Sequence, residues 1–218
     1  MLVMKVSEVG KARAVAEACR IIKEGGIVAF PTETFYGLGV KYDNISALKK
    51  LYEIKKRPKE KAMPLIIDDM KMLSMVASSV SDIAHKLMQK FWPGPLTLLL
   101  NAKEDLSEFI VGEAGKVAVR MPGESFALDF AKALEFPITA TSANISGVPP
   151  ADTPGNVVMH FGDNLDLLID GERTPGGMPS TIVDASGDEI RIMRSGVIPS
   201  EEILKFVSFH PKTEVEKR

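Results

Sequence analysis

The stretch from Gly25 to Val40, GGIVAFPTETFYGLGV, restricts the fold more than any other part of the chain. Its glycine pair can end a helix, and the apolar run over 27–30 predicts a strand that stops at Pro31. In open α/β sheets, ligands bind beyond the carboxyl ends of the strands. We therefore expect the polar side chains after this strand to face a shared crevice; they are Thr32, Glu33, Thr34 and Tyr36.

Two glycines follow in the same stretch. Gly37 and Gly39 would let backbone approach a ligand closely, because glycine has no side chain to hold the ligand away. An ordinary strand followed by a glycine-containing turn accounts for the same residues about equally well. This stretch alone therefore does not establish a binding site.

The composition favours one compact domain without a strong net charge. The 218 residues are 45% hydrophobic, enough to bury roughly 70% of the unfolded surface around a core. The 27 basic and 29 acidic residues nearly balance, and the pI is near 6.0. This balance excludes an overall electrostatic surface for nucleic acid, and it leaves a local basic groove open.

The cysteine and histidine content and the hydropathy of the chain argue against a disulfide-bonded, zinc-binding, secreted or membrane-spanning protein. Cys19 is the only cysteine, so an intramolecular disulfide is excluded, which suits a reducing cytoplasm. His85, His160 and His210 have no second ligand at helical spacing, and we expect no zinc site. The chain has no secretory signal and no apolar run near the ~20 residues that span a bilayer. We expect a cytoplasmic protein without membrane contact.

Hydrophobic periodicity and capping residues predict alternating helices and strands. Ser7, Asn44 and Ser81 can cap helices, and a carboxylate of Asp68–Asp69 can cap another. Val148–Pro154 has no periodicity and is expected to be a loop or a flap. The pattern favours an α/β (α+β) domain with a twisted, mostly mixed open sheet flanked by helices. Helices are expected over 7–25, 44–57, 72–76, 81–91, 124–135 and 200–207, and strands over 27–30, 64–67, 96–100, 116–121, 137–141, 167–170, 180–184 and 190–193.

Basic residues lie near the ends of several predicted elements. Lys55 and Arg57 would share one side of an extended segment, although the same basic run also complements the negative end of its helix dipole. Arg120 projects from the carboxyl end of a strand, where an anion clamp and a structural salt bridge are equally plausible. Arg194 follows a later strand.

Small polar residues lie at the ends of two further strands. Ser142 and Asn144 would present a hydroxyl and an amide on one side of an extended segment, although a simple turn explains them as well. Ser180 opens a later strand. Hydroxyls among several cations suit a triphosphate and a carboxylate. Because the chain has no Walker sequence, no GxGxxG and no defensible Cys-His or Ser-His pair, these residues indicate only an anion-binding α/β enzyme.

Eight short motifs lie along the chain in a fixed order. They are PTETFYGLG at 31–39, KKRP at 55–58, PLI at 64–66, FWPGPLT at 91–97, VAVRMP at 117–122, TSANISG at 141–147, PSTIVD at 179–184 and MRSG at 193–196. In this order and spacing, over roughly residues 8–208, the chain resembles the YrdC/Sua5 family. Together the motifs are highly specific where each alone would be weak.

Within this family, the chain resembles the threonylcarbamoyl-AMP synthases. The resemblance implies a nucleotidyltransferase that makes L-threonylcarbamoyladenylate and pyrophosphate from L-threonine, bicarbonate or CO2, and ATP. It also implies a YrdC-like domain over 8–208 with a concave basic cleft. A downstream threonylcarbamoyl transferase would use the product to modify N6 of adenosine 37 in tRNAs that read ANN codons.

The resemblance assigns roles to individual positions. The catalytic group on the nucleotide comprises Lys55, Arg57, Ser142 and Asn144. Contacts with ATP extend to Thr141 and Arg194, and Thr141 also lies beside threonine. The remaining threonine contacts are Thr32, Arg120 and Ser180, together with Thr34 and Tyr36 from the first polar loop.

Magnesium is expected with ATP, although no protein ligand for it is identified. Asp68 stands where some relatives have a histidine near threonine, Pro150 where some have a serine on the nucleotide, and Ser195 where a proline is usual. The chain ends near the conserved domain. We therefore expect the short form, without the additional carboxy-terminal domain of Sua5, and a flexible tail over 209–218.

Two other functions stay open. A carbamoyl-adenylate enzyme of hydrogenase maturation shares the domain, but such enzymes usually carry acylphosphatase-like and zinc-finger segments, and this chain has no CxxC. A non-catalytic double-stranded RNA-binding module is the second. The near-neutral charge favours only weak, salt-sensitive contact with tRNA or double-stranded RNA.

Overall fold

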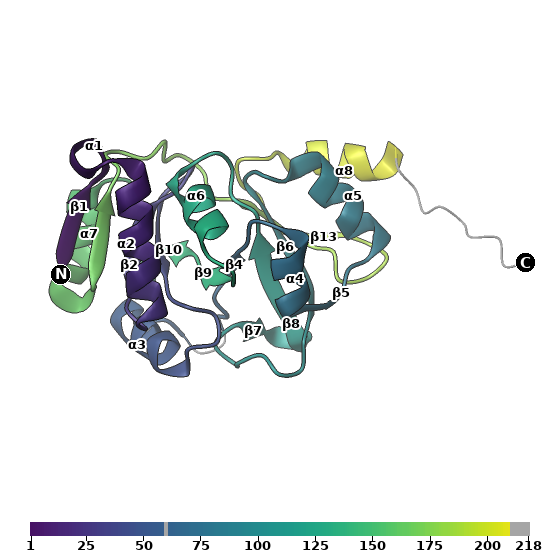
Figure 1. Cartoon of the computed structure of the whole chain (residues 1–218). Helices are drawn as coiled ribbons and strands as arrows, with labels where there is room; N and C mark the ends of the chain where they lie inside the picture. Colours follow the sequence, from purple (N-terminus) through teal and green to yellow (C-terminus); the bar gives the residue numbers. More distant parts are fainter. Residues whose placement is uncertain (59–60, 210–218) are drawn as a thin grey trace, which may run out of the picture.

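A computed structural model describes residues 1–58 and 61–209, which form two mixed sheets with helices packed around them (Figure 1). The first sheet has the order β1-β11-β2-β3-β10. The second has the order β13-β12-β6-β8-β4-β9, with β5 beside β6 and β7 beside β8. The predicted α/β class is confirmed, with the strands divided between two sheets where one was expected. Residues 210–218, predicted as part of a tail, lie outside the described residues.

Most of the predicted elements form, and several short strands join them. The strands are β1 (Leu2–Lys5), β2 (Val28–Pro31), β3 (Tyr36–Gly39), β4 (Leu65–Ile66), β5 (Ala77–Ser79), β6 (Leu96–Ala102), β7 (Val111–Gly112), β8 (Lys116–Arg120), β9 (Ile138–Thr139), β10 (Thr141–Ser142), β11 (Leu167–Asp170), β12 (Thr181–Asp184) and β13 (Arg191–Arg194). The α-helices are α1 (Val6–Val9), α2 (Lys11–Lys23), α3 (Ile45–Lys55), α4 (Met70–Val76), α5 (Asp82–Phe91), α6 (Phe126–Ala133), α7 (Pro154–Phe161) and α8 (Ser200–Phe209), and two short 3₁₀ helices cover Glu113–Gly115 and Gly162–Asn164.

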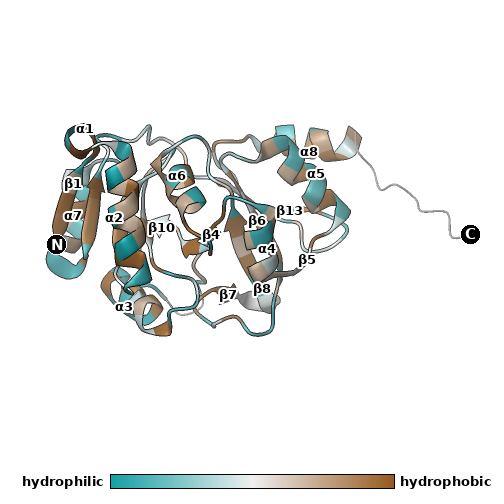
Figure 2. Ribbon diagram, in the orientation of Figure 1, coloured by the Kyte–Doolittle hydropathy of each residue, from teal (hydrophilic) through white to brown (hydrophobic). Residues whose placement is uncertain are grey.

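The helix predicted from Ser7 is wrong in its first turns. The chain begins with β1 and the short α1, and Gly10 breaks the helix because its φ of 81° lies outside the helical region. From there α2 buries Val15, Cys19 and Ile22 on one face, the pattern of an amphipathic helix. Figure 2 shows the matching alternation of hydrophilic and hydrophobic bands along α2.

Side-chain caps fix where three helices begin. Asn44 accepts a hydrogen bond from the Ala47 amide at the start of α3, and Asp69 accepts one from Met72 at the start of α4. Ser81 likewise caps α5. Each cap satisfies an amide that has no partner inside its helix. These three predicted caps are confirmed, with Asp69 as the capping carboxylate.

The opening stretch forms a hairpin, which the sequence did not predict. β2 pairs antiparallel with β3, so the polar residues between them form a hairpin turn and not a loop leading into a helix. A Cβ on Gly39 would lie 2.8 Å from the Phe30 ring, and one on Gly37 would lie 3.3 Å from it. These glycines therefore make room for a core aromatic side chain, and the expectation that they admit a ligand stays a prediction.

One short segment belongs to both sheets. β9 pairs with β4 in the second sheet, and β10, one residue later, pairs with β3 in the first. The Thr139 hydroxyl accepts from the Val40 amide at 3.0 Å, and the Ala140 amide donates to the Pro64 carbonyl at 2.9 Å. The 138–142 segment therefore fixes one sheet against the other, and the main hydrophobic core draws residues from both.

The helices divide between the two sheets. Figure 1 shows α2, α3 and α7 around the first sheet, α4, α5 and α8 around the second, and α6 between them. α7 was not predicted, because the chain up to Pro154 was interpreted as a loop. Thr153 caps this helix by accepting from the Asn156 amide, and Pro154 occupies its first turn.

Candidate functional site

The hairpin turn between β2 and β3 is held by its own hydroxyls. The Thr32 hydroxyl donates to the Phe35 carbonyl at 2.7 Å and accepts from the Thr34 amide at 3.0 Å. The hydroxyls of Thr32 and Thr34 lie 3.1 Å apart, and Thr34 is buried. These contacts give the turn a fixed shape, so the residues it carries are positioned before any ligand arrives.

Lys55, at the last turn of α3, has a fully buried side chain. Its Nζ donates to the Ser142 carbonyl at 2.5 Å and to the Asn144 carbonyl at 2.7 Å. Burial, together with the positive charge of Arg57, lowers the pKa of Lys55 to about 7. Two of the three ammonium donors are therefore used by backbone, and Lys55 fixes the segment that carries Ser142 and Asn144.

Ser142 and Asn144 form a hydrogen-bonded pair. The Ser142 hydroxyl donates to Asn144 Oδ1 at 2.5 Å. Asn144 Nδ2 donates to the carbonyls of Val148 at 2.6 Å and Ile145 at 3.1 Å. Thr141, one residue earlier, is buried. The prediction that the hydroxyl and the amide lie on one side agrees with this contact, and we call Lys55, Ser142 and Asn144 the lysine cluster.

Arg57 lies just beyond α3 and binds its own loop. Its Nε donates to the Lys61 carbonyl and its Nη2 to the Ala62 carbonyl, both at 2.7 Å. Burial lowers the pKa of Arg57. Because Lys56 adopts a left-handed conformation with φ of 48°, Lys55 and Arg57 do not lie on a continuous extended segment as predicted.

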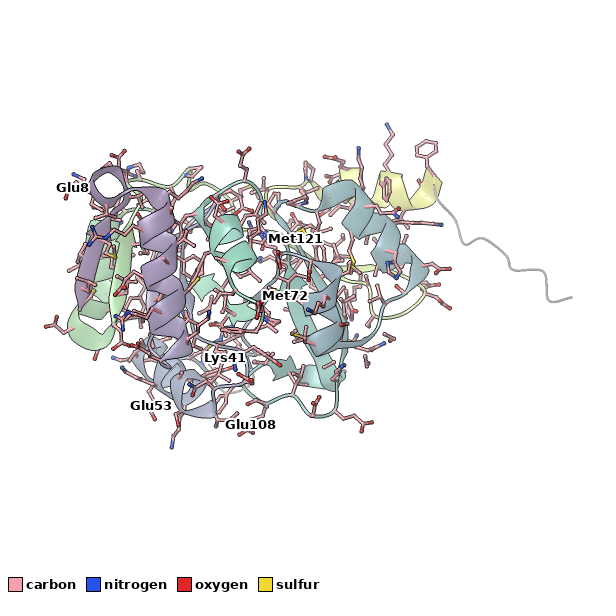
Figure 3. All side chains as sticks on the ribbon, viewed as in Figure 1. Glu8, Lys41, Glu53, Met72, Glu108 and Met121 are labelled. Carbon is pink, nitrogen blue, oxygen red and sulfur yellow. The ribbon has the colours of Figure 1, made fainter. Side chains whose placement is uncertain are left out.

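Arg120 ends β8 and forms the salt bridge that the sequence offered as one of two alternatives. Its Nη2 donates to Glu33 Oε1, and its Nε donates to the Gly94 carbonyl at 3.1 Å. The same Glu33 oxygen accepts from the Gly123 amide at 2.7 Å. Met121, the next residue, lies near the middle of the view in Figure 3. The hairpin turn is thus attached to the end of β8.

Arg194 ends β13 and contacts the start of β12. Its Nη2 donates to the Ser180 carbonyl at 2.7 Å and to the Ser180 hydroxyl at 3.1 Å. That hydroxyl also lies 2.9 Å from the hydroxyl of Thr97. Burial lowers the pKa of Arg194, and the nearby positive charge of Arg120 lowers it further. We call Glu33, Arg120, Ser180 and Arg194 the arginine cluster.

The hairpin connects the two clusters. Ser142 pairs with Gly37 of β3, and the Ala143 amide donates to the Tyr36 carbonyl at 2.8 Å. Glu33 lies in the turn that immediately precedes β3. The hairpin therefore contacts the segment that carries Ser142 and Asn144, and through Glu33 it contacts Arg120. The predicted basic cleft around them stays a prediction.

Tyr36 is the exception among the predicted ligand contacts. Its side chain is fully buried, its hydroxyl donates to the Glu172 carbonyl at 2.7 Å, and it accepts from the Gly171 amide at 3.1 Å. Burial raises the pKa of the hydroxyl. The ring therefore lies in the core and the hydroxyl joins β3 to the chain just after β11, while contact of Tyr36 with threonine stays a prediction.

No substrate contact was predicted for Glu33 from the sequence, although this residue was named among the polar side chains after the first strand. Its Oε2 is buried and has no hydrogen-bond partner among the residues that the structure describes, and the same holds for Oδ1 of Asp68. Burial raises the pKa of Asp68, and the neighbouring Asp69 raises it further. The contact between Glu33 and Arg120 joins residues 87 positions apart, so only pairing of the opposite charges could have suggested it.

Neither a metal cluster nor a membrane span is found in the part of the chain that the structure describes. Over residues 1–58 and 61–209, no three His, Cys, Asp or Glu side chains are grouped as a metal ion would require. Every helix in those ranges is too short or too polar to cross a bilayer.

Comparison with known proteins gives consistent matches. The Sua5/YciO/YrdC family model, described as "Telomere recombination", matches residues 20–196. Threonylcarbamoyl-AMP synthase of Pyrococcus abyssi is 39% identical over 197 residues, which are 89% of this chain and 58% of that protein. The Bacillus subtilis protein of the same name is 37% identical over 190 residues, which are 87% of this chain and 55% of that protein.

A solved structure agrees with these matches. The P. abyssi Sua5 structure described as complexed with L-threonine superimposes with a TM-score of 0.88 and 36% identity, over 95% of this chain and 61% of that one. The chain thus spans a little more than half the length of the curated relatives it matches.

Proposed function

The chain belongs to the Sua5/YciO/YrdC family, and we propose that it makes L-threonylcarbamoyladenylate and pyrophosphate from L-threonine, bicarbonate and ATP. The single observation that carries this proposal is that one hairpin joins the two clusters: its strand β3 pairs with Ser142, which Lys55 holds, and its turn carries Glu33, which binds Arg120. Two anionic substrates can then be held side by side. The relatives that are 37% and 39% identical bear the name of this activity, which supports the same reaction here.

The arginine cluster suits the amino acid. Arg120 would bind the threonine carboxylate, and the hydroxyls of Ser180, Thr32 and Thr34 would orient the rest of the molecule. The amine nitrogen then bonds to the carbon of CO2 and loses a proton, which gives a carbamate. A carbamate oxygen attacks the α-phosphorus of ATP, and pyrophosphate leaves with the electrons of the broken bond.

The lysine cluster suits the nucleotide. Ser142 and Asn144 offer a hydroxyl and an amide, with Thr141 beside them, and Arg57 and Arg194 supply positive charge. The Lys55 ammonium has three N–H donors; two bind backbone carbonyls, and the third is left for a ligand. We therefore assign Lys55 a positioning role on the segment that carries Ser142, in addition to any contact with phosphate.

Magnesium would enter with ATP and lower the charge of the leaving pyrophosphate. Over the described residues, no three His, Cys, Asp or Glu side chains are grouped as a metal ion would require. Magnesium usually keeps one or two carboxylates plus substrate phosphates and water, so this arrangement fits an ion held mainly by the triphosphate. Chelation with EDTA should abolish pyrophosphate release, and added magnesium should restore it.

The product would serve a separate threonylcarbamoyl transferase in the cytoplasm that modifies tRNA. Direct contact with tRNA or double-stranded RNA would be weak, because the basic and acidic residues of the chain nearly balance. The carbamoyl-adenylate reaction of hydrogenase maturation and a purely RNA-binding role are less favoured. Neither accounts for the name carried by the relatives at 37% and 39% identity.

The test is release of pyrophosphate from ATP by the purified chain. We expect release only when L-threonine and bicarbonate are both present, with threonylcarbamoyladenylate as the second product by mass spectrometry. Release that needs neither threonine nor bicarbonate would rule the synthase reaction out. Carbamoyl phosphate in place of both substrates tests the hydrogenase-type alternative in the same assay.

A further inference from the structure

Glu33 is held in place by two donors from one side. Its Oε1 accepts from Arg120 Nη2 and from the Gly123 amide. A Cβ on Gly123 would lie 3.3 Å from the Glu33 carboxylate, so a larger residue there would crowd it. The Glu33 side chain is 17% exposed and that of Arg120 11%. The carboxylate is therefore fixed in a largely buried position at the turn of the hairpin.

The second oxygen of the same carboxylate has no donor. Glu33 Oε2 is buried and makes no hydrogen bond in the structure. Leaving a buried acceptor unsatisfied costs about 1 to 3 kcal/mol, and more for a charged group. A carboxylate that is satisfied on one oxygen and bare on the other is suited to accept an N–H or O–H group from a bound molecule.

The surrounding charges define what that molecule is. Arg120 lies beside Oε1, and it is close enough to Arg194 for its charge to lower the pKa of that guanidinium. A ligand would therefore place an anionic group next to Arg120 and Arg194, and it would place a hydrogen-bond donor at Glu33 Oε2. An α-amino acid carries a carboxylate and an amine on the same carbon, so it matches a guanidinium and a carboxylate that lie side by side.

We propose that Glu33 binds the α-amino group of the amino-acid substrate through Oε2 while Arg120 binds the α-carboxylate. The identity of the amino acid, threonine, rests on the proposed function. The proposal that an α-amino acid binds here rests on the ion pair between Glu33 and Arg120 and on the unpartnered Oε2 of Glu33. Glu33 then selects substrates that carry an amine and holds the nitrogen that forms the carbamate.

A purely structural role for Glu33 makes a different prediction. If Glu33 only held Arg120 in position, its loss would weaken every ligand that carries a carboxylate, whether or not the ligand has an amine. If Glu33 binds the amine, its loss should weaken amine-bearing ligands selectively. L-threonine and (R)-3-hydroxybutanoate differ only in that amine, so the pair of ligands separates the two roles.

The experiment is isothermal titration calorimetry of both ligands with wild type and Glu33→Gln. We expect wild type to bind threonine at least about tenfold more tightly than 3-hydroxybutanoate, a comparison that needs no variant. Glu33→Gln should weaken threonine about tenfold to hundredfold and change 3-hydroxybutanoate by less than about threefold. Glu8→Gln, an exposed change on α1 (Figure 3), should change neither.

Three outcomes would overturn the proposal: equal weakening of both ligands, no weakening of threonine, or no preference of wild type for the amine. Glu33→Asp, which keeps the charge, should retain part of the threonine affinity if Glu33→Gln proves unstable. The pyrophosphate assay separates this inference from the function. Glu33-dependent threonine binding without turnover would refute the synthase reaction alone, and normal turnover with an unchanged KM for threonine in Glu33→Gln would refute the role of Glu33 alone.

Discussion

The lysine and arginine clusters hold their cations in opposite ways. In the lysine cluster, the Lys55 ammonium is bound by two backbone carbonyls and is fully buried. In the arginine cluster, Arg120 is bound by a side-chain carboxylate that keeps one oxygen without a partner. Backbone carbonyls cannot leave without unfolding the loop, whereas a carboxylate can share its cation with a second anion.

This difference separates positioning from binding. Lys55 fixes the segment that carries Ser142 and Asn144, so that side of the site is built before substrate arrives. In the proposed site, Arg120 and Glu33 form an ion pair, and the amino-acid substrate supplies the carboxylate and the amine that bind to it. The first cluster should therefore respond to mutation mainly in stability, and the second in both stability and threonine affinity.

The largest expected effect comes from breaking the arginine cluster. Arg120→Met leaves the Glu33 carboxylate buried without its cation, and we expect a loss of about 3 to 5 kcal/mol in the free energy of unfolding, measured by urea denaturation. The double variant with Glu33→Gln should recover part of that loss, because the unpaired charge is then gone. No recovery would show that Arg120 acts through packing and not through the ion pair.

The next largest effect comes from the lysine cluster. Lys55→Met leaves the carbonyls of Ser142 and Asn144 without their donor and should lower the free energy of unfolding by about 2 to 4 kcal/mol. Threonine binding by calorimetry should weaken less than in Arg120→Met. Equal loss of threonine affinity in the two variants would contradict the division between positioning and binding.

Arg57→Ala should affect turnover with a smaller loss of stability. Removing one charge-assisted contact of about 1.5 to 3 kcal/mol should lower kcat/KM roughly tenfold to hundredfold in the pyrophosphate assay. Arg13→Ala, an exposed change on α2, is the matched control and should leave turnover unaltered. Wild-type turnover in Arg57→Ala would remove this residue from the nucleotide side of the site.

The smallest expected effect is a dependence of stability on pH from Lys55. Folding lowers the pKa of this lysine from 10.5 to about 7, so the unfolded chain binds more protons between these values. The stability of wild type should therefore rise with pH above about 7. From pH 7 to 9 this linkage is worth about 2 kcal/mol, so Tm of wild type should rise by roughly 4 to 8 °C relative to Lys55→Met. A constant difference between the two proteins would mean that the lysine is charged throughout.

Local chemistry made part of this structure predictable. Each cap of α3, α4 and α5 depends only on one side chain and an amide three residues away. Asn44, Asp69 and Ser81 could therefore be predicted as caps from the sequence. α7 was missed although it carries the same kind of signal. Thr153 followed by Pro154 is a cap followed by a favoured first-turn residue, and the prolines before it concealed the pattern.

Non-local contacts account for what the sequence did not predict. The residues expected on the nucleotide and on threonine came from motif positions, and their hydrogen-bond partners came only from the fold. Glu33 binds Arg120, and Tyr36 binds backbone beside Gly171, across 87 and 135 positions. The hairpin was hidden because Gly37 and Gly39 suggest a turn, and only the Phe30 ring packed against them explains why they lie in a strand.

The segment over 138–142, which pairs with one sheet and then with the other, restricts how the protein can vary in length. Insertion of one residue there would shift β10 by one step against β3, and the Ser142 side chain would turn to the opposite face. The connections at the outer edges of either sheet can grow or shrink without this consequence. Related chains should therefore tolerate gain or loss of residues in those outer connections more readily than in this short bridge.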